Sequence, residues 1–459
     1  MKTDRFDVFV IGGGGTGSEI VGRLASAGEM RVGMAERDRL GGECNWYGCV
    51  PSKIMLRSAK IAALARGAGA FGVRIGNVEV DFDAVRARVR AIIEQNTAAG
   101  ARPFTDQGAR VILDNVRVTG PNELETAAGE RLVADRIVFA TGTEAAIPPI
   151  DGLRGGPYWT NKEAIWQESG VPSSLVVIGG GPIGVEFAQI YSRFGARVTI
   201  VEALDRVLPL EDEDSGKAIR EALEADGIDI ITGAKIASAR HAAGSWAIEL
   251  ARRPALGAEA VLVATGRKPM FDGHDLDAIG VKLDDKGKPV LNDTLRTTAP
   301  NIWAAGDATG ELLFTHVGGY EAELVVDDIG GKPRARDYRV VPKVTYCDPE
   351  VASVGLGEQA ASDAGHEVIT SSLPLADNER AVMEGKPEGH VKLLADSRTG
   401  ELLGGHIVGE GAGEMIHEIV IAMAGRISLR AAADGIHAYP TVSEAVRGAF
   451  GRLAEALDR

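Results

Sequence analysis

Two glycine fingerprints of the form GxGxxG constrain the fold of this chain most strongly. The first reads GGGGTG from Gly12 and follows an apolar run over residues 7–11. We expect a helix from there to about Ala27 and a strand over residues 31–35. Glu36 follows this strand, 19 positions after the third glycine of the motif. This order of strand, glycine turn, helix, strand and acid is typical of a βαβ unit that binds a dinucleotide.

The residue types suit that task. Glycines permit a tight turn, the helix N-terminus faces a pyrophosphate, and Glu36 would accept hydrogen bonds from ribose hydroxyls. A single GxGxxG motif is a weak signal, but the whole arrangement occurs a second time. A strand is expected over residues 174–178, a second fingerprint begins at Gly179, and a strand over residues 198–201 precedes Glu202, which lies 18 positions after the third glycine. Two nucleotide sites in one chain indicate electron transfer between two cofactors.

Other segments help to mark the domains. Residues 59–100, rich in Ala, Arg and Glu, are expected to be mostly helical. A strand over residues 131–140 ends in the turn Ala-Thr-Gly, which recurs at residues 264–266, so each nucleotide-binding fold closes in a similar way. Prolines and a glycine within residues 148–152 indicate a linker and a domain boundary near 150.

The last third of the chain differs from the rest. A short strand over residues 302–305 precedes Asp307, whose carboxylate either binds a ligand hydroxyl or caps a turn. Beyond about residue 340 no glycine fingerprint occurs. There we expect strands over residues 341–346, 389–394 and 402–408, and helices over residues 414–424 and 441–453. This pattern predicts an α+β domain with another role.

The stretch GGECNWYGCVPSK, residues 41–53, carries the chemistry. Four residues separate Cys44 from Cys49. On a helix, that spacing places two residues about 140° and about 7.5 Å apart, beyond the roughly 4.4–6.8 Å between Cα atoms that a disulfide accepts. A disulfide here would distort the start of the following helix and be easily reduced, as suits a redox centre. The alternatives are two unrelated buried thiols or a metal site, although the only other cysteine is Cys347.

Size, charge and cysteine usage narrow the possible partners. The 459 residues allow about three domains, and a formal charge of -15 argues against nucleic acid and anionic membranes as partners. Small molecules are expected instead. The N-terminal apolar run is too short for a signal peptide or a membrane span. Three cysteines in so long a chain do not form an extracellular disulfide framework, so we expect a cytoplasmic protein.

Together these motifs resemble the class I pyridine nucleotide-disulfide oxidoreductases, which include dihydrolipoamide dehydrogenase, glutathione reductase, mercuric reductase and soluble transhydrogenase. The resemblance covers nearly the whole chain and implies an α/β fold with two Rossmann-like dinucleotide-binding domains plus a C-terminal α+β dimerisation domain. The expected domains are an FAD-binding domain over 1–150, an NAD(P)-binding domain over 151–268, a central domain completing the FAD site over 269–338, and an interface domain over 339–459 that forms a homodimer.

The resemblance also implies roles for single residues. FAD would be bound by Gly12, Gly14, Gly17, Glu36, Gly42, Thr141, Gly142 and Asp307, with Asp307 on the ribitol. NAD(P)H would be bound by Gly179, Gly181, Gly184, Glu202 and Gly266. Cys49 would be the thiol next to the flavin, and Cys44 the thiol that exchanges with substrate. Lys53 and Glu186 would form an ion pair beside the flavin N5. No metal ligands are expected.

Glu202 bears on the choice of coenzyme. A carboxylate at this position accepts the 2′-hydroxyl of NADH and repels the 2′-phosphate of NADPH, so we expect NAD(H) rather than NADP(H). Arg197 and Arg206 could soften that preference.

The pattern breaks near the C-terminus. The family's disulfide reductases place a catalytic His before a Pro-Thr pair, and here that position holds Tyr439, while Glu444 occupies the position of its Glu partner. With a pKa near 10, Tyr is a poor base at neutral pH, whereas His can exchange protons there. His437, two residues earlier, is a possible substitute. Tyr439 from the partner subunit would act as proton donor, and Glu444 would orient the site.

Further departures separate the chain from its subfamilies. A Tyr before Pro-Thr is similar to soluble transhydrogenase, but that enzyme lacks the second redox cysteine. Mercuric reductase carries a cysteine pair at its C-terminus, whereas no cysteine follows Cys347 here. We expect Cys347 to be a buried free thiol. Trp46 and Tyr47, between the redox cysteines, either narrow the substrate approach or only pack.

These observations predict an FAD-dependent NADH oxidoreductase with a redox-active disulfide, similar to dihydrolipoamide dehydrogenase. Electrons would pass from NADH through FAD and the Cys44/Cys49 pair to a small-molecule or protein acceptor that is a disulfide or reacts with thiols. One alternative is a reductase that acts at the flavin on quinones, metal ions or another nicotinamide. Another is a non-catalytic nucleotide-binding component of a larger complex.

Overall fold

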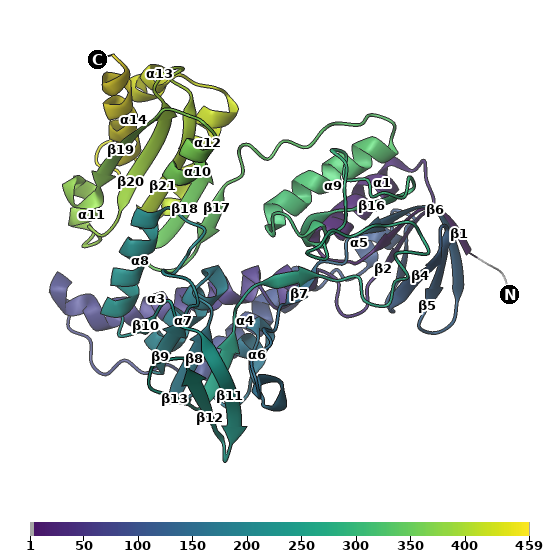
Figure 1. The fold of residues 1–459 in the computed structure, drawn as a ribbon, viewed down its shortest axis with the longest axis horizontal. Coiled ribbons are helices and arrows are strands. Elements are labelled where there is room, and N and C mark those ends of the chain that lie inside the picture. The colour runs from purple at the N-terminus through teal and green to yellow at the C-terminus, as the bar shows by residue number, and fades with distance from the viewer. Residues whose placement is uncertain (1–3, 459) are drawn as a thin grey trace. The chain divides into compact units, whose positions relative to one another are not determined.

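The computed structural model describes residues 4–458, and the chain divides into two compact units, each built from three stretches (Figure 1). Unit 1 comprises the chain through Ile54, Ala84–Ala146 and Gly266–Asp337. Unit 2 comprises Met55–Asp83, Ile147–Thr265 and the chain from Tyr338 onward. Each unit therefore contains sequence from both halves of the protein.

Unit 1 is organised around a seven-stranded sheet. Its strands are β1 (Asp4–Ile11), β2 (Val32–Ala35), β3 (Arg110–Ile112), β4 (Val116–Gly120), β5 (Glu123–Thr126), β6 (Arg131–Phe139) and β16 (Ile302–Ala304). The order β3-β2-β1-β6 is parallel throughout. On the other side of β6, two strands pair with different parts of it. The carboxyl end of β6 pairs parallel with β16, and its amino end pairs antiparallel with β5. Strand β5 in turn pairs antiparallel with β4. The parallel half carries the glycine turn at its carboxyl edge, as the sequence predicts.

Side chains alternate along β1 and build a core on each face of this sheet. Val8 and Val10 pack with the helices α1 (Gly15–Ala27) and α9 (Thr315–Ile329). Phe9 and Ile11 pack with residues of β4, β6 and the 271–304 stretch. Smaller elements complete the unit: α2 (Gly42–Trp46), α5 (Arg102–Thr105), β7 (Thr143–Ala145), β15 (Arg267–Pro269) and η3 (Gly306–Thr309).

Two long helices cross the boundaries between units along the chain: α3 (Cys49–Gly67), followed by η1 (Ala68–Phe71), and α4 (Phe82–Thr97). They confirm most of the helix predicted over residues 59–100. Residues 72–81 are a correction, because the chain there forms neither helix nor strand. Gly72, with φ +77°, ends η1 in the left-handed region, which stops a helix at little cost for glycine.

The first half of unit 2 repeats the nucleotide-binding layout. The elements are α6 (Asn161–Trp166), β8 (Ser174–Ile178), α7 (Pro182–Phe194), β9 (Arg197–Val201), α8 (Glu213–Ala225), β10 (Asp229–Ile231) and β14 (Ala260–Val263). The strands form a parallel sheet in the order β10-β9-β8-β14. A small antiparallel sheet of β11 (Ile236–Ala242), β12 (Ser245–Leu250) and β13 (Leu256–Ala258) packs on it through Trp246 and Ile248.

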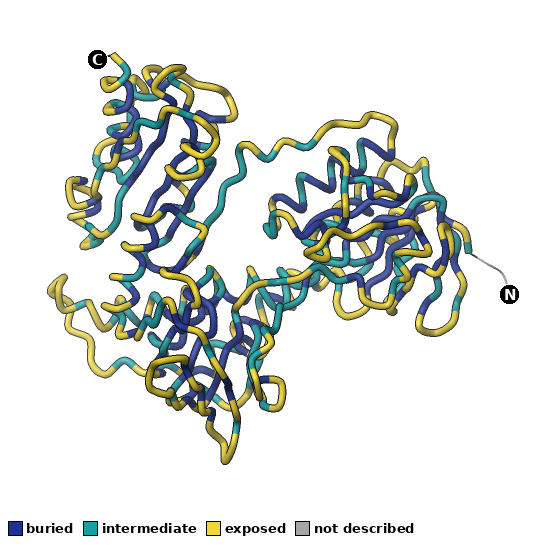
Figure 2. The backbone as a smooth tube through the Cα atoms, viewed as in Figure 1, coloured by how far each residue is buried: buried dark blue, intermediate teal, exposed yellow. Residues whose placement is uncertain are grey.

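The C-terminal part of unit 2 is an antiparallel five-stranded sheet covered by helices. The strands are β17 (Lys343–Thr345), β18 (Glu350–Gly355), β19 (Val368–Pro374), β20 (His390–Asp396) and β21 (Leu402–Gly409), in the order β17-β18-β21-β20-β19. The helices are α10 (Glu358–Asp363), α11 (Glu379–Met383), α12 (Ala412–Ala424), α13 (Leu429–Asp434) and α14 (Glu444–Leu457). Side chains of α12 and α14 form the main core with the sheet, whose central strands are almost wholly buried (Figure 2).

The predicted fold class is therefore confirmed: an α/β protein with two dinucleotide-type sheets and a C-terminal α+β part. The predicted strands and helices all occur, shifted by up to four residues at their ends. The four-part domain division stays a prediction, although β16, from the predicted central domain, completes the sheet of unit 1. In the described range 4–458, no helix has both the length and the apolar composition needed to cross a bilayer.

Candidate active site

The two glycine fingerprints have the same geometry. Gly12 and Gly179 both have φ +111°, where glycine is favoured, and a Cβ on either would lie 2.2 or 2.4 Å from a carbonyl oxygen of the Ala-Thr-Gly turn that closes its fold. A Cβ on Gly17 or Gly184 would lie 2.0 Å from the carbonyl oxygen of the first glycine. Both turns therefore require glycine, and both leave the helix N-terminus open to an anion.

Glu36 and Glu202 make equivalent hydrogen bonds beside the two glycine turns. The backbone N–H of Gly13 donates to Glu36 Oε2 at 2.8 Å, and that of Gly180 donates to Glu202 Oε2 at 2.6 Å. The second oxygen of each carboxylate accepts from the N–H two residues further along, at 2.7 and 2.8 Å. Both side chains are buried. Each carboxylate thus holds a fixed negative charge next to its glycine turn, where the predicted ribose contact requires it.

The turn after β6 brings more polar groups to the first fingerprint. The buried hydroxyl of Thr141 has no partner among the described residues, which suits a bound ligand. The Thr143 hydroxyl donates to Asp307 Oδ2 at 3.1 Å and accepts from Arg267 Nε at 2.8 Å. Burial raises the pKa of Asp307, and the positive charge of Arg267 opposes that shift. Arg267 also forms an ion pair of 3.0 Å with Glu43.

The cysteine stretch packs directly on the first fingerprint. A Cβ on Gly42 would lie 2.7 Å from the Cα of Gly14, so only glycine allows this backbone contact. Helix α2 ends at Trp46, and α3 begins at Cys49. The two cysteines therefore lie on separate helices, so the spacing that a single continuous helix would impose does not apply.

Cys44 and Cys49 are both free thiols and share one partner, the hydroxyl of Thr315 at the start of α9. Thr315 Oγ1 lies 3.3 Å from Cys44 Sγ and 3.4 Å from Cys49 Sγ. A hydrogen bond from the Cys44 thiol lowers the pKa of Cys49 to about 6, with smaller contributions from Thr315 and from the charge of Lys53. The same thiol–thiol hydrogen bond, together with burial, raises the pKa of Cys44. A reduced pair at neutral pH is thus one thiolate, on Cys49, and one thiol.

Trp46 and Tyr47 pack against the loop that precedes the cysteine stretch. The Trp46 indole N–H donates to the carbonyl of Leu40 at 2.9 Å, and its ring lies 4.5 Å from the Arg39 guanidinium. The Tyr47 hydroxyl donates to Asp38 at 3.0 Å. These contacts favour packing over a role in shaping the substrate approach.

Lys53 and Glu186 belong to different units, so their predicted ion pair stays a prediction. Lys53 lies one helical turn after Cys49 on α3, where its charge favours the thiolate. Glu186 is buried in α7 and accepts the backbone N–H of Tyr346 at 2.9 Å.

The C-terminal candidates Tyr439, His437 and Glu444 all have hydrogen-bond partners within the chain. The Tyr439 hydroxyl donates to Glu379, which raises the pKa of Tyr439 further. Glu444 accepts the backbone N–H of Thr441 at 3.2 Å, and its role in orienting the site stays a prediction. Both ring nitrogens of His437 have partners, Glu418 at 2.9 Å and the carbonyl of Gly435 at 3.1 Å.

Cys347 is a buried free thiol, as predicted. It donates to the carbonyl of Pro349 at 3.2 Å, and burial raises its pKa well above the ordinary value. Its burial and raised pKa disfavour a redox role.

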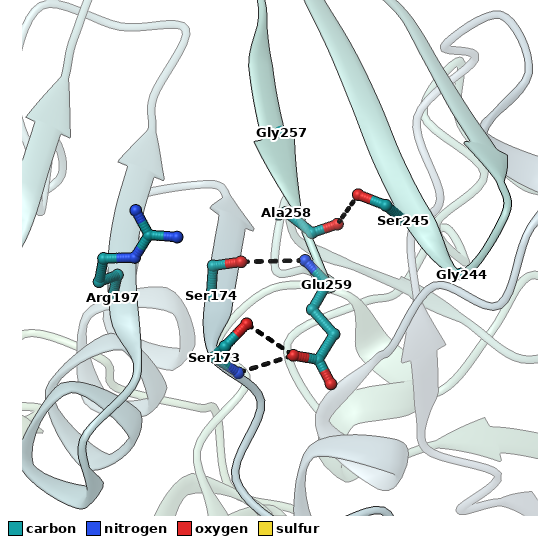
Figure 3. Close-up of a pocket in the computed structure, with 8 residues that line it drawn as sticks. All are labelled: Ser173, Ser174, Arg197, Gly244, Ser245, Gly257, Ala258 and Glu259. Atoms are coloured by element: carbon teal, nitrogen blue, oxygen red, sulfur yellow. Dashed lines mark hydrogen bonds between the residues drawn. The ribbon is translucent and has the colours of Figure 1, made fainter.

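Unit 2 holds a polar pocket of about 480 Å³ lined in part by Ser173, Ser174 and Glu259 (Figure 3). It lies at the amino ends of β8, β9 and β14, whereas the glycine turn follows the carboxyl end of β8. Ser173 donates to Glu259 twice at 2.8 Å, and Ser174 accepts the Glu259 N–H at 3.1 Å. Because these groups satisfy one another, the pocket offers few free polar atoms to a ligand.

Sequence reasoning missed Thr315, Arg267, Thr143 and Glu43. Thr315 is 266 residues from Cys49, and Arg267 reaches Thr143 through the pairing of β15 with β7. No local spacing signals such contacts. The arginine directly after the second Ala-Thr-Gly turn was the one available sign, because it adds a charge where a cofactor is expected.

Comparison with known families agrees with this geometry. Residues 6–322 match the family described as pyridine nucleotide-disulphide oxidoreductase, and residues 341–450 match its dimerisation domain. The chain belongs to the pyridine nucleotide-disulphide oxidoreductase family and is an enzyme of the flavoprotein class that uses FAD and NAD(H).

Particular relatives share most of the chain's length. Dihydrolipoyl dehydrogenase of Chlorobaculum tepidum is 35% identical over 97% of this chain and 96% of its own length. That of Bacillus subtilis is 32% identical over 100% of this chain and 99% of its own. Among solved structures, the HOCl-induced flavoprotein disulfide reductase RclA from Escherichia coli has a TM-score of 0.88 at 28% identity, covering 97% of this chain and 99% of that one.

The first site fits FAD. The glycine turn at Gly12 allows a close backbone approach, the N-terminus of α1 is open to a pyrophosphate, and the Thr141 hydroxyl lacks a partner. Asp307 lies in the same unit after the carboxyl end of β16, and Gly42, two residues before Cys44, packs on Gly14 of the fingerprint. The second site fits NAD(H) through Gly179 and Glu202.

Proposed function

We propose that the chain passes electrons from NADH, by way of FAD, through Cys44 and Cys49 to an acceptor that is a disulfide or reacts with thiols. The observation that carries this proposal is the convergence of the two cysteines on Thr315, in the unit that holds the first fingerprint. Dihydrolipoyl dehydrogenases among the relatives support a dithiol–disulfide reaction.

The residues divide the work as follows. FAD, when bound, would accept an electron pair from NADH and supply it to the oxidised cysteine pair. Once reduced, Cys44 attacks a sulfur of the acceptor disulfide, forming a mixed disulfide and releasing one acceptor thiol. Cys49 then attacks Cys44, which forms the Cys44–Cys49 disulfide and releases the second thiol. The acceptor is thereby reduced by two electrons and the pair oxidised by two.

The proposal includes a homodimer built through residues 341–450, the part that matches the dimerisation domain. Large apolar side chains are exposed there, among them Ile421 at 63% and Ile436 at 98%. By family resemblance, Tyr439 or His437 of one subunit would serve the cysteines of the other as proton donor. A cytoplasmic location stays part of the proposal.

A panel of disulfides tests the function. NADH oxidation is measured with lipoamide, glutathione disulfide and a protein disulfide, using wild type, Cys44→Ser and Cys49→Ser. Cys347→Ser is the matched control, because this buried thiol is outside the site. We expect both site variants to lose disulfide reduction and the control to retain it. Disulfide reduction that persists in both site variants would overturn the proposal and place the chemistry at the flavin, as for a quinone or another nicotinamide.

A second candidate acceptor is a thiol-reactive metal ion. RclA from Escherichia coli, whose structure resembles this chain, has been solved as a Cu(II) complex. Within residues 4–458, no cluster of three or more His, Cys, Asp or Glu side chains could hold a metal, so copper would meet mainly the two thiols as a substrate. NADH-dependent Cu(II) reduction that is lost in Cys44→Ser, without turnover of any disulfide, would favour this candidate. Tight NADH binding without any turnover would favour a non-catalytic nucleotide-binding component.

A further inference from the structure

A buried lysine of the C-terminal sheet binds the start of α8 within unit 2. Lys392 on β20 is 5% exposed, and its ammonium group donates to Asp212 Oδ1 at 2.9 Å and to Asp214 Oδ2 at 2.8 Å. Its third partner is Glu358 of α10, at 3.0 Å. An ammonium group has three protons to donate, so the three carboxylates satisfy it. Burial disfavours the charged form of Lys392, but these carboxylates raise its pKa above the ordinary value.

Asp212 is the last residue of a loop that begins beside the predicted coenzyme carboxylate. We call residues 203–212, which directly follow Glu202, the coenzyme loop; they form neither helix nor strand. At its start, the backbone N–H of Leu204 donates to Glu202 at 2.8 Å. At its end, Asp212 caps α8 by accepting the backbone N–H of Asp214 at 3.2 Å. The loop therefore connects Glu202 to the partner of Lys392.

The middle of the coenzyme loop packs on the second glycine turn. The backbone N–H of Leu208 donates to the carbonyl of Gly180 at 2.8 Å. A Cβ on Gly180 would lie 3.1 Å from Val207 Cγ1, and a Cβ on Gly216 of α8 would lie 3.0 Å from the Val207 carbonyl oxygen. The side chains of Val207 and Leu208 are buried. The loop thus lies between the glycine turn and α8, and its position affects both.

A contribution to stability alone does not account for the lysine. A buried ion pair adds little net stability, because the cost of removing both charges from water offsets their attraction. What such a cluster does impose is geometry, since three carboxylates must meet at one ammonium group. Lys392 is 180 positions from Asp212 and lies in the part that matches the dimerisation domain. The contact therefore connects that part to the coenzyme loop.

We propose that Lys392 is a positioning residue for NAD(H). By holding Asp212, it fixes the coenzyme loop against the second glycine turn, so that Gly180 and Glu202 keep the hydrogen bonds that orient them towards a pyrophosphate and a ribose. Lys392 acts through Asp212 and not by contact with the coenzyme. This inference goes beyond the proposed function, because coenzyme binding involves neither Cys44 nor Cys49.

The test measures binding of NAD⁺ to the oxidised flavoenzyme by isothermal titration calorimetry, where no electron transfer takes place. Lys392→Met keeps an unbranched side chain and removes the charge. Asp212→Asn keeps an oxygen that can cap α8 and removes the charge. We expect each variant to raise the Kd for NAD⁺ by on the order of tenfold. Glu358→Gln is the matched control, since it removes a partner of the same lysine outside the coenzyme loop, and its Kd should stay within about twofold of wild type.

Hydrogen exchange of the backbone amides, followed by mass spectrometry, separates positioning from a general loss of stability. In Lys392→Met and Asp212→Asn, peptides from residues 203–212 should exchange faster, while peptides from α12 exchange as in wild type. An unchanged Kd in both variants, an equal rise in Glu358→Gln, or faster exchange throughout unit 2 would overturn the proposal. If Lys392→Met does not fold, Asp212→Asn decides alone. A failure of disulfide reduction would refute the proposed function and leave these readings unchanged.

Discussion

Glu202 is the residue through which we expect unit 2 to discriminate between nicotinamide coenzymes. Its carboxylate is buried and fixed by the N–H groups of Gly180 and Leu204. Two arginines could reduce the effect of this negative charge on the coenzyme. Arg206 already donates to the carbonyls of Pro209 and Glu211. Arg197 is the first residue of β9, at the opposite end of the strand from Glu202.

Replacing Glu202 with Ser should therefore move the preference towards NADPH. Removing the charge that repels a 2′-phosphate should raise the ratio of kcat/KM for NADPH over NADH by about tenfold. Steady-state kinetics with both coenzymes measures the ratio. Arg197→Ala, at the opposite end of the same strand, is the control and should leave the ratio of kcat/KM values unchanged. An unchanged ratio in Glu202→Ser would show that another group selects the coenzyme.

Lys53 should set the acidity of Cys49. The Cys49 thiol ionises with a pKa of about 6, helped by its hydrogen bond from Cys44 and by the charge of Lys53. Its alkylation by iodoacetamide should therefore rise as pH increases through about 6. Lys53→Met removes a cation that favours the thiolate, so the midpoint should move upward to about pH 7. Lys60→Met is the control on the same helix, where the lysine pairs with Glu410. A midpoint that stays near pH 6 in Lys53→Met contradicts this account.

Among single residues, the sequence predicted those whose residue type and spacing along the chain together form a motif. The glycines, the two acids after the strands and the cysteine pair could all be found from local order. Thr315 could not, because its role depends on the packing of α9 against α1 through Gly318 and Thr16. The Glu379 partner of Tyr439 escaped for the same reason, being 60 positions away in the chain.

The elements α2 and α3 show how the fold accommodates two cysteines five positions apart. One continuous helix would separate them too far for a disulfide. The chain instead ends α2 at Trp46 and begins α3 at Cys49, so both sulfurs reach Thr315. The sequence predicted a distorted helix start if the two thiols form a disulfide, but it did not predict where the break between α2 and α3 falls. Gly48 lies in this break, and a Cβ there would lie 3.2 Å from the Glu43 carbonyl oxygen.

Arg267 of strand β15 connects α2, the helix that contains Cys44, to Asp307, the predicted ribitol ligand. Arg267 bonds Glu43 beside Cys44, and it bonds Thr143, whose hydroxyl donates to Asp307. Arg267→Met should therefore lower the stability of unit 1 by about 1–3 kcal/mol, the usual cost of lost charge-assisted hydrogen bonds. It should also raise the pKa of Asp307 further, because the opposing positive charge is removed.

Thermal unfolding followed by flavin fluorescence measures this effect, with FAD expected to be released at a lower temperature. Lys268→Met is the matched control one residue along β15, because its exposed pair with Glu144 contributes little. Equal effects of the two variants would contradict the special role of Arg267.

For the whole molecule, the exposed apolar residues of the C-terminal part indicate a subunit interface. Ile421 on α12 is 63% exposed in a part of the chain that matches the family's dimerisation domain. If Ile421 is buried in a dimer, Ile421→Glu removes roughly 1.5–3 kcal/mol of hydrophobic stabilisation. The dimer dissociation constant should then rise on the order of 10–100-fold.

Sedimentation equilibrium over a range of concentrations measures that constant. Leu210→Glu is the control, since Leu210 is 87% exposed in unit 2 but outside the dimerisation match. A dissociation constant unchanged by Ile421→Glu would place the interface elsewhere.

The assembly of the units is what the sequence predicted least well. Linker signals near residue 150 indicated a boundary, and the compact units divide between Ala146 and Ile147. The return of the stretch from Gly266 to unit 1 depends on the pairing of β16 with β6 and of β15 with β7. Such pairings join residues more than a hundred positions apart, and no periodicity in the sequence records them.

The most direct test of whether Cys44 and Cys49 accept electrons from NADH counts the thiols that NADH alone produces. The air-oxidised enzyme is treated with NADH without oxygen or acceptor, alkylated, and the peptide that carries Cys44 and Cys49 is analysed by mass spectrometry. If the pair lies in the electron path, both cysteines become alkylated on NADH addition and neither does without it. An alkylation pattern that NADH does not change would contradict the account.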